Sequence, residues 1–120
     1  MSAKPVIQIK RVYAPPEKTD GFRALVDGLW PRGIKKENGH IDAWLKEAAP
    51  SAELRKWFNH LPERWEEFAR KYREELKDEN KTKALIGLAK KHKKITLLYG
   101  ARDETHNQAV VLMQLLKSAL

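Results

Sequence analysis

Residues 95–116 read ITLLYGARDETHNQAVVLMQLL, and this stretch decides the expected fold class. Ile95–Tyr99 is a short apolar run typical of a strand, and the later part is apolar almost all round. Thr105 and Gln108 match a capping box, which predicts a helix from Thr105 to about Ser118. A strand that leads directly into a helix indicates a layered α/β domain.

Two further strands and a helical middle part are predicted from the rest of the chain. Val6–Val12 alternates apolar and polar residues, and Phe22–Asp27 is largely apolar, so both indicate strands. Caps, a proline suited to a first turn and apolar residues at helical spacing predict helices in four places. These run from Asp42 to Glu47, from Ser51, from Pro62, and from about Thr82 to His92.

These elements predict a single α/β domain over residues 1–120, with a short, mostly parallel sheet of about three strands packed by four to five helices. The first two strands are joined by only ten residues, Tyr13 to Phe22. Crossovers between parallel strands usually need about a dozen residues or more. An antiparallel arrangement of this first pair therefore stays open as an alternative.

The composition narrows the class of protein. The chain has 120 residues, 24 Lys and Arg against 16 Asp and Glu, a net charge of +8 and no cysteine. Disulfide scaffolds, thiolate zinc sites and cysteine nucleophiles are therefore excluded. No apolar run approaches the roughly 20 residues of a membrane span, and the start lacks a secretory apolar region, so we expect a cytoplasmic protein without a membrane partner. The positive charge indicates an anionic partner without naming one.

The segment between the last strand and the last helix is a candidate anion site. In open α/β sheets, ligands bind beyond the carboxyl ends of the strands, and a helix N-terminus there offers free N–H groups. Arg102, a planar bidentate donor, is expected to bind a phosphate or carboxylate together with Thr105 and Asn107. The alternative is that Asp103 or Thr105 only caps the helix and that Arg102 is a solvated surface residue.

Further candidates follow the other two strands. If the three strands are parallel, residues at their carboxyl ends line one cleft together with the last turn. The candidate ligand-binding residues are then Arg11, Arg32, Arg102, Thr105, Asn107 and Trp30, and the candidate catalytic residues are Asp27, Asp103 and His106. In this hypothesis the arginines bind a small anion, the aspartates orient them, and the histidine moves a proton. The alternative is an internal Asp–Arg salt bridge with Trp30 anchored in the core, so whether the protein is an enzyme stays open.

Other chemistry is less well supported by the sequence. The four histidines do not have metal-ligand spacing, so no metal or cofactor is expected. Lys90–Lys94 is the densest basic run and either closes a helix or contacts nucleic-acid phosphates. The alternative function is therefore a nucleic-acid-associated or regulatory binding module. A third alternative is an interaction protein that dimerises through exposed aromatic residues, and the oligomeric state is not predicted.

Three blocks of sequence carry a family resemblance. They are RALVDGLWPRG at residues 23–33, WLKEAAPSAELRKWF at 44–58, and TLLYGARD at 96–103 together with HNQA at 106–109. In this order they resemble the YeaO-like family (domain of unknown function 488), small bacterial and archaeal proteins. The resemblance implies an α/β domain and little about activity. It also implies a set of shared polar positions, which here are Arg11, Asp27, Arg32, His60, Asp103, His106 and Asn107.

The chain departs from that family pattern at two positions. The family usually has Arg where this chain has Gly28, and Asp where it has Leu61. The first departure removes a charge beside the proposed cleft. The second removes a helix cap before Pro62. More distant relatives place cysteines near the end of the last strand, and this chain has none.

Overall fold

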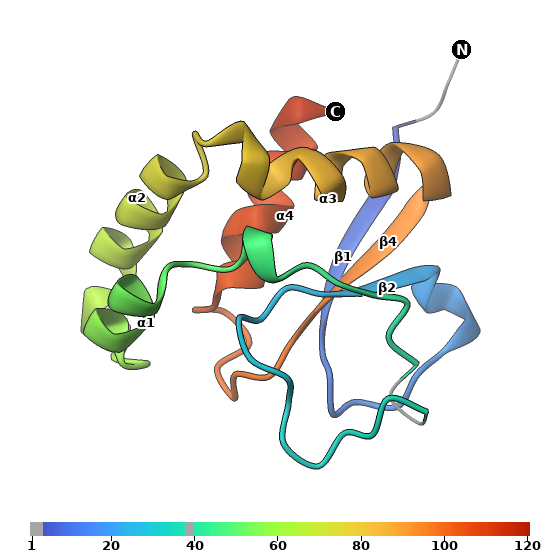
Figure 1. Cartoon of the computed structure of the whole chain (residues 1–120), viewed down its shortest axis with the longest axis horizontal. Helices are drawn as coiled ribbons and strands as arrows, with labels where there is room; N and C mark the ends of the chain where they lie inside the picture. Colours follow the sequence, from blue (N-terminus) through green and yellow to red (C-terminus); the bar gives the residue numbers. More distant parts are fainter. Residues whose placement is uncertain (1–3, 38–39) are drawn as a thin grey trace.

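The computed structural model describes residues 4–37 and 40–120 and contains a wholly parallel sheet (Figure 1). Within these residues the sheet has four strands in the order β1-β4-β2-β3. The strands are β1 (Val6–Arg11), β2 (Phe22–Leu25), β3 (Ala43–Trp44) and β4 (Lys94–Tyr99). The α/β class is confirmed, and the described residues form four strands where about three were expected.

The pairing of β1 and β2 with β4 shows whether the first two strands are parallel or antiparallel. The two strands are parallel but not neighbours, because β4 lies between them and pairs with both. The link contains only a short 3₁₀ turn, η1 (Lys18–Asp20), which lies against β4. Thr96 Oγ1 donates a hydrogen bond of 2.6 Å to the backbone oxygen of Asp20, and the Asp20 carboxylate pairs with Arg23. These buried contacts allow a short loop to replace a crossover helix.

Four α-helices occur among the described residues, within the expected range of four to five. They are α1 (Ala52–Phe58), α2 (Trp65–Glu75), α3 (Glu79–His92) and α4 (Gln108–Ala119). The α4 helix packs on β1 and β4, α3 packs on β4, and α2 and α1 lie farther out, with α2 against α4 (Figure 1). Each helix thus reaches the sheet directly or through another helix.

The expected helix from Asp42 to Glu47 is wrong. Ala43–Trp44 forms the edge strand β3 instead, followed by the 3₁₀ turn η2 (Lys46–Ala48). The backbone N–H groups on either side of β3 donate to β2: Asp42 N bonds to Arg23 O and Leu45 N to Leu25 O, each at 2.8 Å. Pairing with a neighbouring strand thus prevails over local helical preference. Ser51, by contrast, caps α1 as expected, because its hydroxyl accepts from Leu54 N at 3.2 Å.

The core lies on both faces of the sheet. On the helix side, buried residues of β4 such as Leu97 pack with Leu112 of α4 and Tyr72 of α2. On the other side, Leu25 and Leu98 pack under the loop after β2, which contributes Trp30. Pro62 begins the 3₁₀ turn η3 (Pro62–Arg64) that leads into α2. No helix of the described residues is both long and apolar enough to cross a membrane.

Candidate functional site

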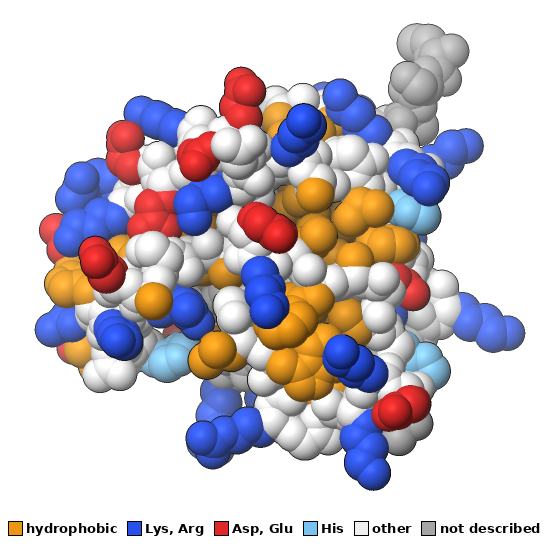
Figure 2. All heavy atoms as spheres, in the orientation of Figure 1, with side chains coloured by type: hydrophobic (Ala, Val, Ile, Leu, Met, Phe, Trp, Pro, Cys, Tyr) orange, Lys and Arg blue, Asp and Glu red, His pale blue; other side chains and the backbone are white. Residues whose placement is uncertain are grey.

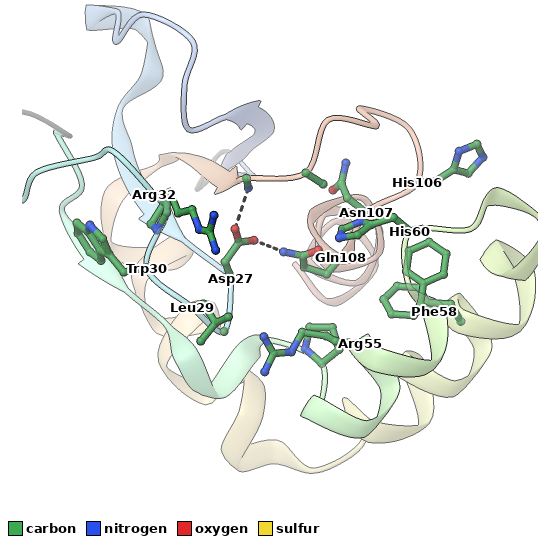
Figure 3. A pocket seen from close by; sticks show the side chains of 16 residues that line it. Asp27, Leu29, Trp30, Arg32, Arg55, Phe58, His60, His106, Asn107 and Gln108 are labelled. Carbon is green, nitrogen blue, oxygen red and sulfur yellow. Dashed lines mark hydrogen bonds between the residues drawn. The ribbon is translucent and has the colours of Figure 1, made fainter.

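A pocket of about 450 Å³ lies at the carboxyl edge of the sheet (Figure 3). The loop after β2, residues 27–32, forms one side of it, and Gly100 and Ala101 after β4 form the back. The other side comes from the start of α4 and from residues of α1 and α2, including Arg55, Phe58 and Phe68. The pocket therefore occupies the place where open α/β sheets usually bind ligands.

Asp27 connects three elements at the back of this pocket. Its Oδ2 accepts from Gly100 N at 2.8 Å, and its Oδ1 accepts from Gln108 Nε2 (dashed lines in Figure 3). Burial raises the pKa of Asp27 to about 6, although these hydrogen bonds and the positive charges of Arg55 and His60 oppose the rise. Asp27 therefore joins the ends of β2 and β4 to the first residue of α4, and both of its oxygens already accept a hydrogen bond.

Arg55 projects from α1 into the pocket below Asp27 (Figure 3). Its guanidinium lies against Gly28, so closely that a Cβ atom at position 28 would stand 2.8 Å from Arg55 Cζ. Among the described residues, no acceptor bonds the buried Nε of Arg55, and no carboxylate lies within ion-pair distance of the guanidinium. The missing side chain at Gly28 thus makes room for a cation whose buried Nε donor is unpaired.

Two more basic side chains and an apolar wall complete the pocket. Arg32 and His60 line it from opposite sides, and both residues are exposed. Phe58 and Phe68 stack with their ring centroids 4.2 Å apart. Across the pocket, Trp30 is held by a 2.6 Å hydrogen bond from Nε1 to a backbone oxygen and by an edge contact with a second tryptophan. The pocket therefore combines positive charge with rigid aromatic walls.

The turn before α4 differs from the prediction. The helix begins at Gln108, and Asn107 is its N-cap, with its side-chain oxygen accepting from Val110 N at 3.2 Å. The expected helix start and capping box at Thr105 are therefore wrong, because the Gln108 side chain bonds Asp27 instead. Asp103 Oδ1 accepts from the backbone N–H groups of Thr105 and of His106, at 3.0 and 3.1 Å, so these residues form a separate turn.

His106 is paired within this turn. Its Nδ1 lies 2.8 Å from Asp103 Oδ2, and its ring meets the edge of Trp65 at 5.2 Å between centroids. The hydrogen bond from His106 and those from the backbone and Thr105 lower the pKa of Asp103 to about 2. In Figure 3 the His106 ring points away from Asp27, so the two side chains do not converge on one point of the pocket.

The structure brings some of the predicted site residues together and separates others. Those that line the pocket are Asp27, Trp30, Arg32, His106 and Asn107. Those outside its lining are Arg11, Arg102, Asp103 and Thr105. Arg11 is occupied elsewhere, because its Nε donates to Ala101 O at 3.0 Å. Arg102 and Thr105 are exposed, and the later start of α4 explains why neither of them meets a helix terminus.

The site residues predicted from the sequence left out three polar residues of the pocket, Arg55, His60 and Gln108. Arg55 precedes Phe58 by three positions and therefore shares its helix face, which was the available signal. Gln108 had been assigned to a capping box, so its long-range role was not visible. Among the described residues, no group of three or more His, Cys, Asp or Glu side chains could hold a metal ion.

Comparisons with known proteins give a family and relatives that are aligned over nearly their whole length. The family model described as "Inactive DUF488-N3 subclade" matches residues 6–120. The uncharacterized protein YeaO of Escherichia coli (strain K12) is 49% identical over 113 residues, which cover 93% of this chain and 97% of YeaO. The uncharacterized protein Rv3073c of Mycobacterium tuberculosis (strain ATCC 25618 / H37Rv) is 42% identical over 112 residues, or 92% of each chain. No solved structure matches the chain significantly.

Proposed function

The chain belongs to the DUF488-N3i family, and from this premise we propose that its pocket binds a small molecule bearing a phosphate or carboxylate group. The description of the family as an inactive subclade favours binding without turnover. The site supports the same choice, because both oxygens of Asp27 already accept hydrogen bonds and the His106 ring points away from Asp27. The proposed function is therefore that of a small-anion-binding protein.

The buried Nε of Arg55, which has no hydrogen-bond partner among the described residues, is the observation that carries this proposal. A buried donor without a hydrogen-bond partner costs free energy, and a planar guanidinium matches the geometry of a phosphate or carboxylate. Arg32 adds positive charge to the same pocket, and the His60 ring lines it as well. An anion seated against Arg55 would accept from its unpaired donor and be attracted by both arginines.

Calorimetric titration with inorganic phosphate and with acetate, at low ionic strength, tests the proposal. Arg55→Gln should abolish the binding, whereas Lys56→Gln removes an exposed charge from the same helix outside the pocket and should preserve it. Arg55→Lys separates charge from geometry, since it keeps the charge and loses the bidentate fork. Circular dichroism would verify that each variant is folded. Equal affinities for Arg55→Gln and the unchanged protein would overturn the proposal.

The alternative of a nucleic-acid-binding module remains a prediction from the sequence. In Figure 2, Lys and Arg side chains are spread around the visible face of the molecule and interspersed with acidic ones. Lys90 and Lys91 lie exposed in the last turn of α3, where cations are favourable for structural reasons. Titration of single- and double-stranded DNA and RNA at several salt concentrations would test this alternative, because phosphate contacts make affinity fall steeply with salt.

A further inference from the structure

The pocket is larger than an inorganic anion requires. Its volume is about 450 Å³, whereas a water molecule in the liquid takes about 30 Å³ and pockets for organic ligands span about 300–1,000 Å³. An anion held at Arg55 would therefore fill only part of the space. The remaining space can hold the rest of a larger ligand, here called its body, to which the anionic group is covalently attached.

The walls around Arg55 indicate what that body is. Leu29 and Trp30 stand on one side of it and Phe58 on the other, so the cation lies between two apolar surfaces (Figure 3). Leu29 is 71% exposed at the rim, which is unusual for a large apolar side chain in this protein. A ligand with an apolar body would bury these surfaces, and the held positions of the aromatic rings reduce the ordering cost of binding.

The charges of the pocket limit the number of acidic groups on the ligand. Asp27 stands above Arg55 in the same pocket, and its carboxylate is negative at neutral pH. A second anionic group next to it would be repelled, whereas an uncharged ring would not be. The Arg55 position, between apolar walls and with a carboxylate beside it, therefore fits a single acidic group, while Arg32 lies apart from it at an exposed position.

Resting on the proposed anion binding, we propose that the ligand is an organic acid with one phosphate or carboxylate group on an apolar, ring-sized body. The acidic group lies against the Arg55 guanidinium, and the ring lies between the Leu29–Trp30 side and Phe58. Inorganic phosphate and acidic groups on strongly polar bodies are then the weaker ligands.

Three probes separate the two parts of the ligand in calorimetric titrations: inorganic phosphate, phenyl phosphate and phenol. Phenyl phosphate should bind at least about tenfold more tightly than inorganic phosphate, because the ring adds apolar area to the buried surface. Phenol should bind more weakly than phenyl phosphate, because it lacks the charged group. The affinity of phenyl phosphate should fall in Arg55→Gln.

A surface substitution tests the apolar wall without disturbing the core. Leu29→Ser should weaken phenyl phosphate severalfold and leave inorganic phosphate unchanged, whereas Val6→Ser, at another exposed apolar residue, should change neither. Equal affinities for phenyl phosphate and inorganic phosphate would overturn the inference and leave the anion site standing. Binding of neither would overturn both proposals. Phenol binding as tightly as phenyl phosphate would overturn the anion site and, with it, the inference that the ligand is an acid.

Discussion

Replacing Asp27 by Asn should remove a pH dependence of stability that this buried carboxyl imposes on the protein. Burial raises its pKa in the folded protein to about 6, from 3.8 for an ordinary carboxyl. An amide at this position can still accept from Gly100 N, and the Gln108 amide can turn to accept from the new NH₂ group. The variant therefore keeps the links between β2, β4 and α4 and loses only the charge.

The sign of this pH dependence of stability follows from the direction in which the pKa of Asp27 is shifted. Below pH 3.8 the carboxyl is protonated in both the folded and the unfolded chain, and its favourable contribution is complete. As pH rises through 6, the unfolded chain has already released its proton, and the folded protein must ionise a buried group. The free energy of unfolding therefore falls by about 3 kcal/mol in total, of which about 2 kcal/mol is lost between about pH 4.5 and 7.5.

Urea unfolding at pH 4.5 and at pH 7.5 measures this effect. The free energy of unfolding of Asp27→Asn, relative to the unchanged protein, should rise by about 2 kcal/mol between the two conditions. Groups that titrate identically in both proteins cancel in this difference. Arg55 and His60 face Asp27 and remain present in both. A relative stability that stays constant within about 0.5 kcal/mol would refute the assignment of a raised pKa to this carboxyl.

Asp103→Asn supplies a comparison of opposite sign, measured by urea unfolding at pH 7 and near pH 3. The pKa of Asp103 is lowered to about 2 by hydrogen bonds from His106, Thr105 and the backbone. Its contribution is therefore present above pH 3.8 and disappears as pH falls toward 2. The substitution should destabilise the protein at pH 7 and have less effect near pH 3. A larger loss at acidic pH would contradict the observed pairing.

Two further predictions concern the positions of Arg55 and of the α4 start. Gly28→Ala should displace the guanidinium of Arg55 and weaken phosphate binding about 10-fold or more. Gly87→Ala, at a glycine with open space around it, should bind phosphate normally. Unchanged binding in Gly28→Ala would contradict the close approach of Arg55 to Gly28. Asn107→Ala should lower the free energy of unfolding by about 1 kcal/mol because it removes the N-cap, and Thr105→Ala should cost less. Thermal and urea unfolding measure the loss of stability in Asn107→Ala and Thr105→Ala. A larger loss in Thr105→Ala would place the helix start at residue 105.

Local sequence patterns were sufficient for most of the elements. The apolar run at Ile95–Tyr99 and the apolar segment after it predicted β4 and α4, and Ser51 predicted the start of α1. These signals are periodicity and capping, which depend on residues close together in the chain. The same reasoning failed at Ala43–Trp44, because the hydrogen bonds that make this segment a strand come from β2, about twenty positions earlier.

The candidate site shows a similar division. The rule that parallel strands end at one edge predicted that Asp27 and the turn containing His106 lie at a common place, and both line the pocket. The same rule could not indicate Arg55, since it lies on a helix and not at a strand end. Nor could it show that Gln108 bonds Asp27, because the two residues are 81 positions apart.

The sequence by itself determined the fold class, the absence of thiol chemistry and the edge of the sheet where polar residues gather. Only the tertiary structure decided the strand order, the start of α4, and that Arg55 and not Arg102 lines the pocket. The physical reason is the separation along the chain over which each interaction acts. Helical spacing and turn chemistry act over a few residues, whereas α1 reaches the loop after β2 through packing, and Gly28 leaves the space that the guanidinium occupies.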